Sequence, residues 1–399
     1  MPSGLSYQQL FKVPFIMDII SRYHAPGDMI CQYYGLGMMP STGVQQIVGN
    51  AGQYDIFDGT RSLAPYSAQS GPPQDVNRKP VGTVPITVPR MYNKIGIMDN
   101  DLFGTRDLGQ AYSQPVPSRG EAYFARQVRY LKTRMDNSHE FMAAHMFRGG
   151  WDLRPLSTGS QQLVLDDKTS GVTGAITNDT KVPAANMSQI TAADGSGDII
   201  ATSWDDPTAN IPEQNQKLQA NAAQINGRRI EDVWLNGVTF SPLLTNSVLQ
   251  GVGGSVYRIF DTMNPHTEYN AAQKMPDTGT TVVFRGMPEI KFHVYNQGYV
   301  TPGTSETQAA QTGANFTRFI PDNYAIMTPS PGEWTEMVQG SEVWQPNLLE
   351  GGPRVADGFD MGTERSIDPP KHDVKMLYNG APVITEPSAV YYAEVIFTP

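Results

Sequence analysis

The sequence has few of the features that mark secreted, membrane or disulfide-stabilised proteins. It has 399 residues and one cysteine, Cys31, so no intramolecular disulfide can form and the fold has to be stable without one. No run of about 18 apolar residues occurs, and the N-terminal segment lacks a basic lead followed by a long apolar stretch. We therefore expect a chain that neither spans a membrane nor carries an obvious secretion signal.

Motifs for catalysis and cofactor binding are missing as well. The chain has no phosphate-binding loop, no G-x-S-x-G turn, no pair of cysteines for a metal or redox centre, and no dinucleotide fingerprint. Carboxylates such as Asp99 and Asp101 lie close in sequence, but any acidic chain of this size contains such pairs. No catalytic residue, metal ligand or cofactor is predicted.

The stretch NSHEFMAAH at residues 137–145 superficially resembles a zinc-protease helix. The histidines of that motif lie four residues apart, whereas His139 and His145 lie six apart. At about 100° per residue they are separated by roughly 120° around a helix, so they cannot share one tetrahedral ion. We interpret both as packing or surface histidines.

The charge and the turn-forming residues restrict the remaining possibilities. A formal net charge of −10 argues against a protein whose whole surface binds nucleic acid, although a locally basic face is compatible with it. With 38 glycines, 31 prolines and few long helical patterns, much of the chain should form strands, turns and extended segments.

Residues 118–149 carry the longest helical pattern. We expect this helix to begin at a capping box of Ser118 and Glu121 and to end at Gly149 and Gly150. At about 1.5 Å per residue it would be about 45 Å long, much longer than a typical globular helix. Its apolar stripe consists of Phe124, Val128, Leu131, Met135, Met142 and Met146.

The polar side of this helix is basic. It carries Arg119, Arg126, Arg129, Lys132 and Arg134. We expect a solvated face whose cations pair along the helix with Glu121, Asp136 and Glu140. The alternative is that this face contacts nucleic acid or an acidic neighbouring subunit.

Two strand-like segments between about Arg61 and Met98 flank the turn-forming tip Gly71-Pro72-Pro73. In the second segment Val84, Ile86 and Val88 alternate with polar or small residues. This pattern predicts a long two-stranded projection, with an ordinary surface hairpin as the alternative.

Residues 210–251 are typical of a compact α/β layer. A second helix should begin at Asn210 and end at Gly227, a strand should follow at 230–235, and a third helix should run over 241–249 and end at Gly251. Two later strands are also predicted. Alternation at residues 290–294 places His293 away from the core, and the apolar segment 389–397 indicates a central or doubly covered strand.

Three segments in the C-terminal third carry a likeness to a known family. They are Arg285-Gly286-Met287-Pro288-Glu289-Ile290 leading to Val294-Tyr295 and Tyr299-Val300; Phe319-Ile320-Pro321-Asp322-Asn323; and Asp368-Pro369-Pro370 with Ala381-Pro382-Val383-Ile384 and Pro387. In this order they resemble the lambda major capsid protein E family of tailed bacteriophages. The order of elements along the chain resembles the HK97-like capsid fold.

The resemblance implies an α+β fold with five parts. These would be an N-terminal arm at 1–60, an extended E-loop at 61–100, a P-domain at 101–203 with the spine helix at 118–149, an α/β A-domain at 204–345, and a return with C-terminal strands at 346–399.

The resemblance also implies a structural, non-enzymatic function. Many copies would self-assemble into the hexamers and pentamers of an icosahedral phage head that encloses double-stranded DNA through non-specific contact. A decoration protein, a portal and a scaffold would be further partners, with no membrane and no cofactor. Assembly would take place in the host bacterial cytoplasm, and the final location would be the virion capsid.

Six residues are expected at subunit interfaces under this resemblance. Four belong to the E-loop, namely Gly71, Pro72, Pro73 and Lys79, and two belong to the spine helix, namely Arg126 and Arg129. Since lambda-like members generally use decoration proteins, we do not expect a covalent cross-link at Lys79.

Two other functions stay open at this point. A hydrolase using His139 or scattered carboxylates would be a monomer or small oligomer with measurable turnover. Another self-assembling subunit, of a tail tube or a surface layer, would form tubes or sheets. The long helix followed by an α/β layer disfavours this last possibility.

Overall fold

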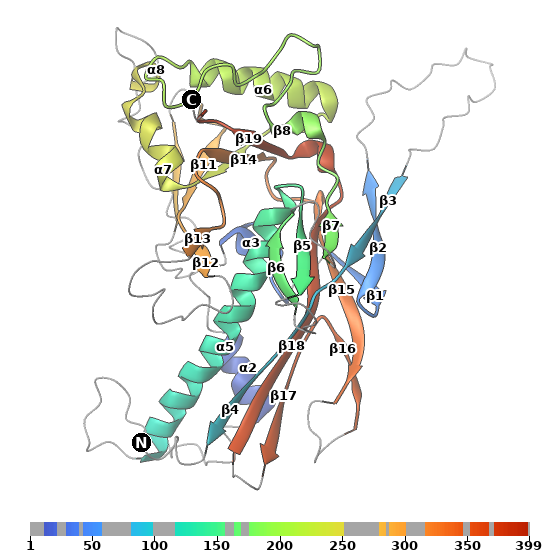
Figure 1. Cartoon of the computed structure of the whole chain (residues 1–399). Coiled ribbons are helices and arrows are strands. Elements are labelled where there is room, and N and C mark those ends of the chain that lie inside the picture. Colours follow the sequence, from blue (N-terminus) through green and yellow to red (C-terminus); the bar gives the residue numbers. More distant parts are fainter. Residues whose placement is uncertain are drawn as a thin grey trace, which may run out of the picture. The chain divides into compact units, whose positions relative to one another are not determined.

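The structure is a computed structural model. It describes residues 12–21, 29–39, 43–57, 81–98, 116–155, 163–168, 175–250, 279–284, 287–300, 316–345, 352–366 and 371–397. The chain divides into two compact units made of discontinuous segments. Unit 1 comprises Met1–Gly52, Ile86–Glu140 and Met337–Pro382, and unit 2 comprises Gln53–Pro85, Phe141–Glu336 and Val383–Pro399. Both contain helices and strands (Figure 1), so the fold is α+β as predicted.

Unit 1 is built on a six-stranded sheet. Its strands are β1 (Val44–Val48), β4 (Arg90–Met98), β15 (Thr335–Trp344), β16 (Arg354–Asp357), β17 (Phe359–Ser366) and β18 (Lys371–Ile384). β18 is central because β4 and β17 both pair with it in antiparallel register, and its side chains are buried almost throughout. The helices of this unit are α2 (Val13–Ser21), α3 (Met29–Tyr33) and the first part of α5.

The predicted long helix is confirmed as α5 (Val116–Met146). Its 31 residues span about 46 Å, and the chain passes from unit 1 to unit 2 within it, after Glu140. Every residue of the predicted apolar stripe is at most 4% exposed. The helix is followed by Gly149 and Gly150, which have φ angles of +95° and +125° and end it as expected. The side chains of the expected capping box lie outside the described residues.

Unit 2 contains a second six-stranded sheet with the order β10-β11-β9-β14-β19-β8. These strands are β10 (Gly279–Val283), β11 (Lys291–Tyr295), β9 (Asp232–Leu235), β14 (Tyr324–Thr328), β19 (Tyr391–Glu394) and β8 (Met187–Ser188). Helix α6 (Ile211–Ile225) lies along the sheet (Figure 1), and its Leu218 and Ala222 belong to the same apolar core as Val233 and Phe292. β19 is paired on both sides, so the C-terminal strand is central, as predicted.

Three smaller sheets complete the described part of the fold. β5 (Gly150–Pro155) pairs with β6 (Leu163–Asp167) and β7 (Ile176–Asp179), and β12 (Gly298–Val300) pairs with β13 (Phe316–Arg318). β2 (Ala51–Phe57) pairs with β3 (Val81–Thr87). The partner of β3 is therefore β2, which lies before residue 61, whereas the sequence pattern placed both strands of the projection between residues 61 and 98. Val84, Ile86 and Val88 are buried.

The helices around residue 240 differ from the sequence expectation. α6 is capped by Asn210, whose side chain accepts a hydrogen bond from the backbone N–H of Glu213, as predicted. The single third helix is wrong, because the segment forms α7 (Gly237–Phe240), a 3-10 turn (Ser241–Thr245) and α8 (Ser247–Gln250). Asn236 and Asn246 each cap a new start by accepting from the N–H three residues later, at 2.9 Å in both cases.

Within the described ranges, no helix combines the length and the hydropathy needed to cross a lipid bilayer.

Candidate functional site on the long helix

Three stripes of different character run along α5. The first is the apolar stripe. The second, which we call the buried polar stripe, lies beside it and consists of Lys132, Asp136, His139 and Glu140. The third, the exposed basic stripe, consists of Arg126, Arg129, Tyr130 and Arg134. Each stripe follows spacings of three, four and seven residues, which place side chains on one helical face.

The buried polar stripe corrects the expectation of a solvated face. Lys132 Nζ lies 2.5 Å from Asp136 Oδ2, so the predicted pairing along the helix is present, but both side chains are buried. Glu140 is fully buried as well. The expectation failed because residues far away in sequence cover this side of the helix, which helical periodicity does not record.

The covering segment is held by two adjacent residues of α5. Glu140 Oε1 accepts from the backbone N–H of Ile30 at 2.7 Å, and Oε2 accepts from that of Cys31 at 2.9 Å. His139 Nε2 donates to the carbonyl of Leu36 at 2.5 Å. Glu140 thus satisfies N–H groups in the first turn of α3, where negative charge is favourable, and His139 holds the segment beyond its end. We call this arrangement the N-terminal clamp.

His139 is neutral in the clamp. Burial lowers its pKa to about 4, the bond to Leu36 acts in the opposite direction, and nearby Lys132 lowers the pKa further. Because Nε2 has to carry the hydrogen that the Leu36 carbonyl accepts, Nδ1 carries a lone pair. The Tyr378 ring meets the imidazole edge-on at 5.2 Å between centroids.

The exposed basic stripe contains two of the residues predicted at subunit interfaces. Arg126 and Arg129 are exposed and lie three residues apart, on one side of α5. Tyr130 is 42% exposed, and the guanidinium of Arg134 lies 5.8 Å from its ring centroid. In the part of α5 whose side chains are described, both acidic residues belong to the buried polar stripe. The other four predicted residues, Gly71, Pro72, Pro73 and Lys79, lie outside the described residues.

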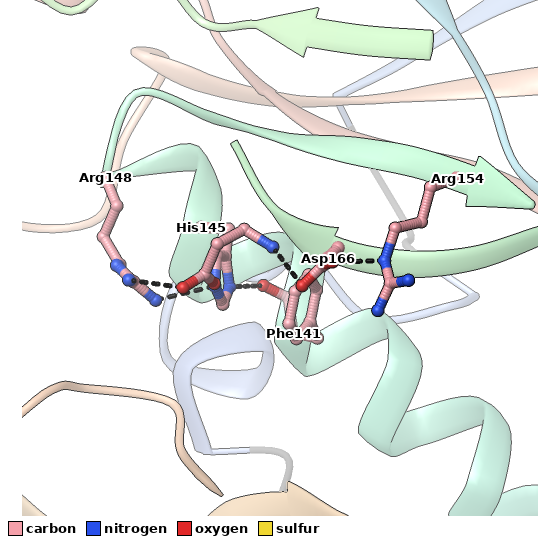
Figure 2. Close-up of polar contacts among 6 residues, drawn as sticks. Phe141, His145, Arg148, Arg154 and Asp166 are labelled. Atoms are coloured by element: carbon pink, nitrogen blue, oxygen red, sulfur yellow. Dashed lines mark hydrogen bonds and ion pairs between the residues drawn. The ribbon is translucent and has the colours of Figure 1, made fainter. Parts of the chain in front are cut away.

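The end of α5 carries a cluster that sequence reasoning missed (Figure 2). The ring of His145 stacks on Phe141 with 3.7 Å between centroids, and Nδ1 lies 2.8 Å from the Phe141 carbonyl oxygen. Nε2 lies 2.6 Å from Arg148 Nη1 and also contacts Asp167 Oδ1 of β6. The neighbouring Asp166 pairs with Arg154 of β5. We call Phe141, His145, Arg148 and Asp167 the helix-end cluster.

The helix-end cluster also contacts aromatic rings of two other strands. Phe141 meets Tyr299 of β12 edge-on at 4.9 Å, and the guanidinium of Arg148 lies 5.8 Å from the ring centroid of Tyr392 in β19. Burial raises the pKa of both tyrosines to about 12. The spacing of Phe141 and His145 was the only hint in the sequence, since β6, β12 and β19 are far away along the chain.

His293 is fully buried, so the prediction that it faces away from the core is wrong. β11 lies between β10 and β9, and both of its faces are covered. His293 Nε2 lies 2.8 Å from Asp232 Oδ1, and Nδ1 lies 2.9 Å from Thr281 Oγ1. These three residue types can form a catalytic triad, but here they are buried between neighbouring strands and Trp234 stacks on the imidazole, so no substrate can reach them.

No group of three metal-ligating side chains occurs in the ranges that the structure describes. The described part of the chain offers instead a long helix that carries a docked segment on one side and exposed arginines on another. Such an arrangement suits contacts with other macromolecules.

Comparison with known proteins decides the matter. The family model of phage major capsid protein E matches residues 51–340. The chain belongs to this family. The protein is therefore a building protein of a phage capsid, and many copies assemble into that capsid in the virion. The alternatives of a hydrolase and of a tail-tube or surface-layer subunit are not favoured. No curated protein matches the sequence.

One solved structure agrees with this family in fold, and two further matches have lower TM-scores. The crystal structure of a putative capsid protein of a prophage from E. coli CFT073 matches with a TM-score of 0.57 at 14% identity, over 98% of this chain and 99% of that one. A phage-related protein from Bordetella bronchiseptica RB50 has a TM-score of 0.48 at 12% identity, over 96% and 97%. The capsid of Ralstonia phage GP4 has a TM-score of 0.40 at 10% identity, over 92% and 91%. The predicted HK97-like fold of the family is confirmed.

Proposed function

We propose that this family member assembles into the hexamers and pentamers of an icosahedral head that encloses double-stranded DNA. The observation that carries the proposal is the family match over residues 51–340, which the HK97-like fold supports. The chain acts as a structural subunit without catalysis or cofactor. It is assembled in the host bacterial cytoplasm with a scaffold, a portal and a decoration protein as partners, and its contacts with DNA are non-specific.

In this proposal the parts of the chain have separate assembly roles. Residues 1–60 act as an arm, 61–100 as the E-loop, 101–203 as the P-domain, 204–345 as the A-domain, and 346–399 as the return with the C-terminal strands. The E-loop residues Gly71, Pro72, Pro73 and Lys79 and the spine-helix residues Arg126 and Arg129 contact neighbouring subunits. Exposure of the two arginines on one side of α5 supports their role.

Electron microscopy and sedimentation test the proposal. The full chain is expressed alone and together with the neighbouring phage genes, and both preparations are purified. Closed shells, or pentamer and hexamer rings, are the expected result. A monodisperse monomer under both conditions, or open tubes and flat sheets, would overturn the proposal.

A further inference from the structure

The hydrogen bonds of His145 in the helix-end cluster cannot all form at once. Nδ1 has to donate, because its partner is the carbonyl oxygen of Phe141 at 2.8 Å. In a neutral ring Nε2 then carries a lone pair, which accepts from Arg148 Nη1 at 2.6 Å. Asp167 Oδ1 contacts the same Nε2, and a carboxylate oxygen can only accept. A neutral ring therefore satisfies Arg148 and a charged ring satisfies Asp167.

We propose that His145 is a proton-operated switch between these two arrangements. In the neutral state Arg148 bridges the end of α5 and β6, with Nη1 on His145 and Nη2 3.4 Å from Asp167 Oδ2. When His145 takes up a proton from solvent, Nε2–H donates to Asp167, and the imidazolium repels the guanidinium. Arg148 then loses its acceptor on the helix and is left with Asp167 and the ring of Tyr392.

Every neighbouring element contributes charged or titratable groups to this balance. Arg148 follows α5, Asp166 and Asp167 belong to β6, and Asp166 is bound by Arg154 of β5. Lys168 donates to the Gly149 carbonyl and pairs with Asp179 of β7. Tyr299, Tyr324 and Tyr392 complete the surroundings from β12, β14 and β19. Asp179 also pairs with Lys181, so the proton on His145 adds a further positive charge to a cluster whose carboxylates are already paired with cations.

The cluster gives a proton a route to a buried ring. His145 is 1% exposed, but the Asp167 side chain that contacts it is 45% exposed. Burial is the largest influence on His145 and lowers its pKa, so the neutral arrangement prevails at neutral pH and protonation requires acid. In the charged arrangement the hydrogen bond with His145, with Arg148 in addition, lowers the pKa of Asp167 to about 2, so Asp167 stays a carboxylate when it accepts from His145.

The test follows the ring nitrogens of His145 in the full-length, unassembled protein labelled with ¹⁵N-histidine, between pH 8 and the acid limit of folding. The His145→Gln variant assigns the signal. At high pH we expect one protonated and one unprotonated nitrogen, and on acidification two protonated nitrogens. Arg148→Gln should raise the midpoint and Asp167→Asn should lower it, each by about one pH unit, because they remove a like and an opposite charge.

Two controls separate a switch from a merely structural cluster. Arg154→Gln breaks the adjacent ion pair with Asp166 and should shift the midpoint by less than half as much. Arg148→Lys keeps the charge and should leave the midpoint between those of wild type and Arg148→Gln. The proposal is overturned if the wild-type ring keeps one protonation state throughout, or if Arg148→Gln and Asp167→Asn shift the midpoint in the same direction.

Discussion

Glu140 is the residue on which the N-terminal clamp depends most. It is fully buried, and its carboxylate accepts from two backbone N–H groups of α3. Glu140→Ala would leave both donors without this acceptor, so we expect unfolding free energy to fall by about 2–4 kcal/mol. Glu140→Gln keeps one acceptor oxygen and should lose about half as much. Urea unfolding of the unassembled protein measures both changes.

Glu213→Gln is the matched control for Glu140. Glu213 also lies on a helix and pairs with Lys217, but on the surface, so no measurable loss is expected. Hydrogen exchange at Ile30 and Cys31 gives a second readout, because both amides should exchange faster in Glu140→Ala. A variant with unchanged stability and unchanged exchange at these amides would show that the clamp does not hold α3.

Three buried histidines make stability depend on pH. Burial lowers the pKa of His139, His145 and His293 in the folded protein below the value of about 6.5 that they have when unfolded. Below this pH the unfolded chain therefore binds more protons. The free energy of unfolding is therefore insensitive to these histidines above pH 6.5. On acidification it falls towards each folded pKa, by up to about 1.4 kcal/mol per pH unit for each histidine.

His139 provides the test of this pH dependence. Its folded pKa of about 4 implies a loss of about 3 kcal/mol between pH 6.5 and pH 4. Urea midpoints at pH 7.5, 6.5, 5.5 and 4.5 should fall less steeply in His139→Gln, whose amide can still donate to the Leu36 carbonyl. An identical slope in wild type and variant would contradict the assignment.

His293 shows a limit of sequence patterns: the alternation of its strand could be seen in the sequence, but the layer that covers the second face of that strand could not.

At the scale of elements, the pairing of β5 with β7 depends on Gly150. A Cβ at this position would lie 2.0 Å from the Asn178 carbonyl oxygen of β7, and the φ angle is +125°. Gly150→Ala should therefore lower unfolding free energy by about 2–4 kcal/mol, because β5 and β7 have to separate. Gly195→Ala is the control: its φ is +73° but the space around it is open, so about 1 kcal/mol is expected. Thermal unfolding compares the two, and equal losses would mean that the close approach has no energetic weight.

The elements differ in how far their sequences determine them. α5 was predictable because its apolar stripe, with the glycines that follow it, is a local pattern whose burial the structure bears out. The region from 236 to 250 was not: Asn236 caps a short helix that begins before the predicted one, and Asn246 restarts a short helix within 241–249, which was predicted as a single helix. The buried polar stripe was visible as a spacing of charged residues, but its burial depends on residues 29–36, about a hundred positions away.

At the scale of the molecule, local patterns predicted individual helices and strands, while the resemblance in the C-terminal third supplied the α+β class, the family and its fold. The two units could not be derived from the sequence. Each is assembled from three separate segments, and strands such as β4 and β18 meet across more than 270 positions. The predicted interface residues show the same contrast between what a local pattern predicts and what depends on distant or separate chains. Arg126 and Arg129 could be recognised as exposed from the helical pattern, but the surface that we propose they contact belongs to another molecule and is not encoded in that pattern.

We expect shell assembly to depend on Arg126 and Arg129. Reversing both charges in Arg126→Glu/Arg129→Glu should leave the fold intact, because both side chains are exposed. It should abolish or greatly reduce shell formation, because the proposed contacts of these two cations with the neighbouring subunit are lost. Arg126→Lys/Arg129→Lys keeps the charge and should still assemble. Sedimentation and electron microscopy count the shells, and circular dichroism checks the fold. Since salt weakens interactions between exposed charges, the loss of shells in the charge-reversed variant should also depend on ionic strength. Normal shells from the charge-reversed variant would exclude this face of α5 from the subunit interface.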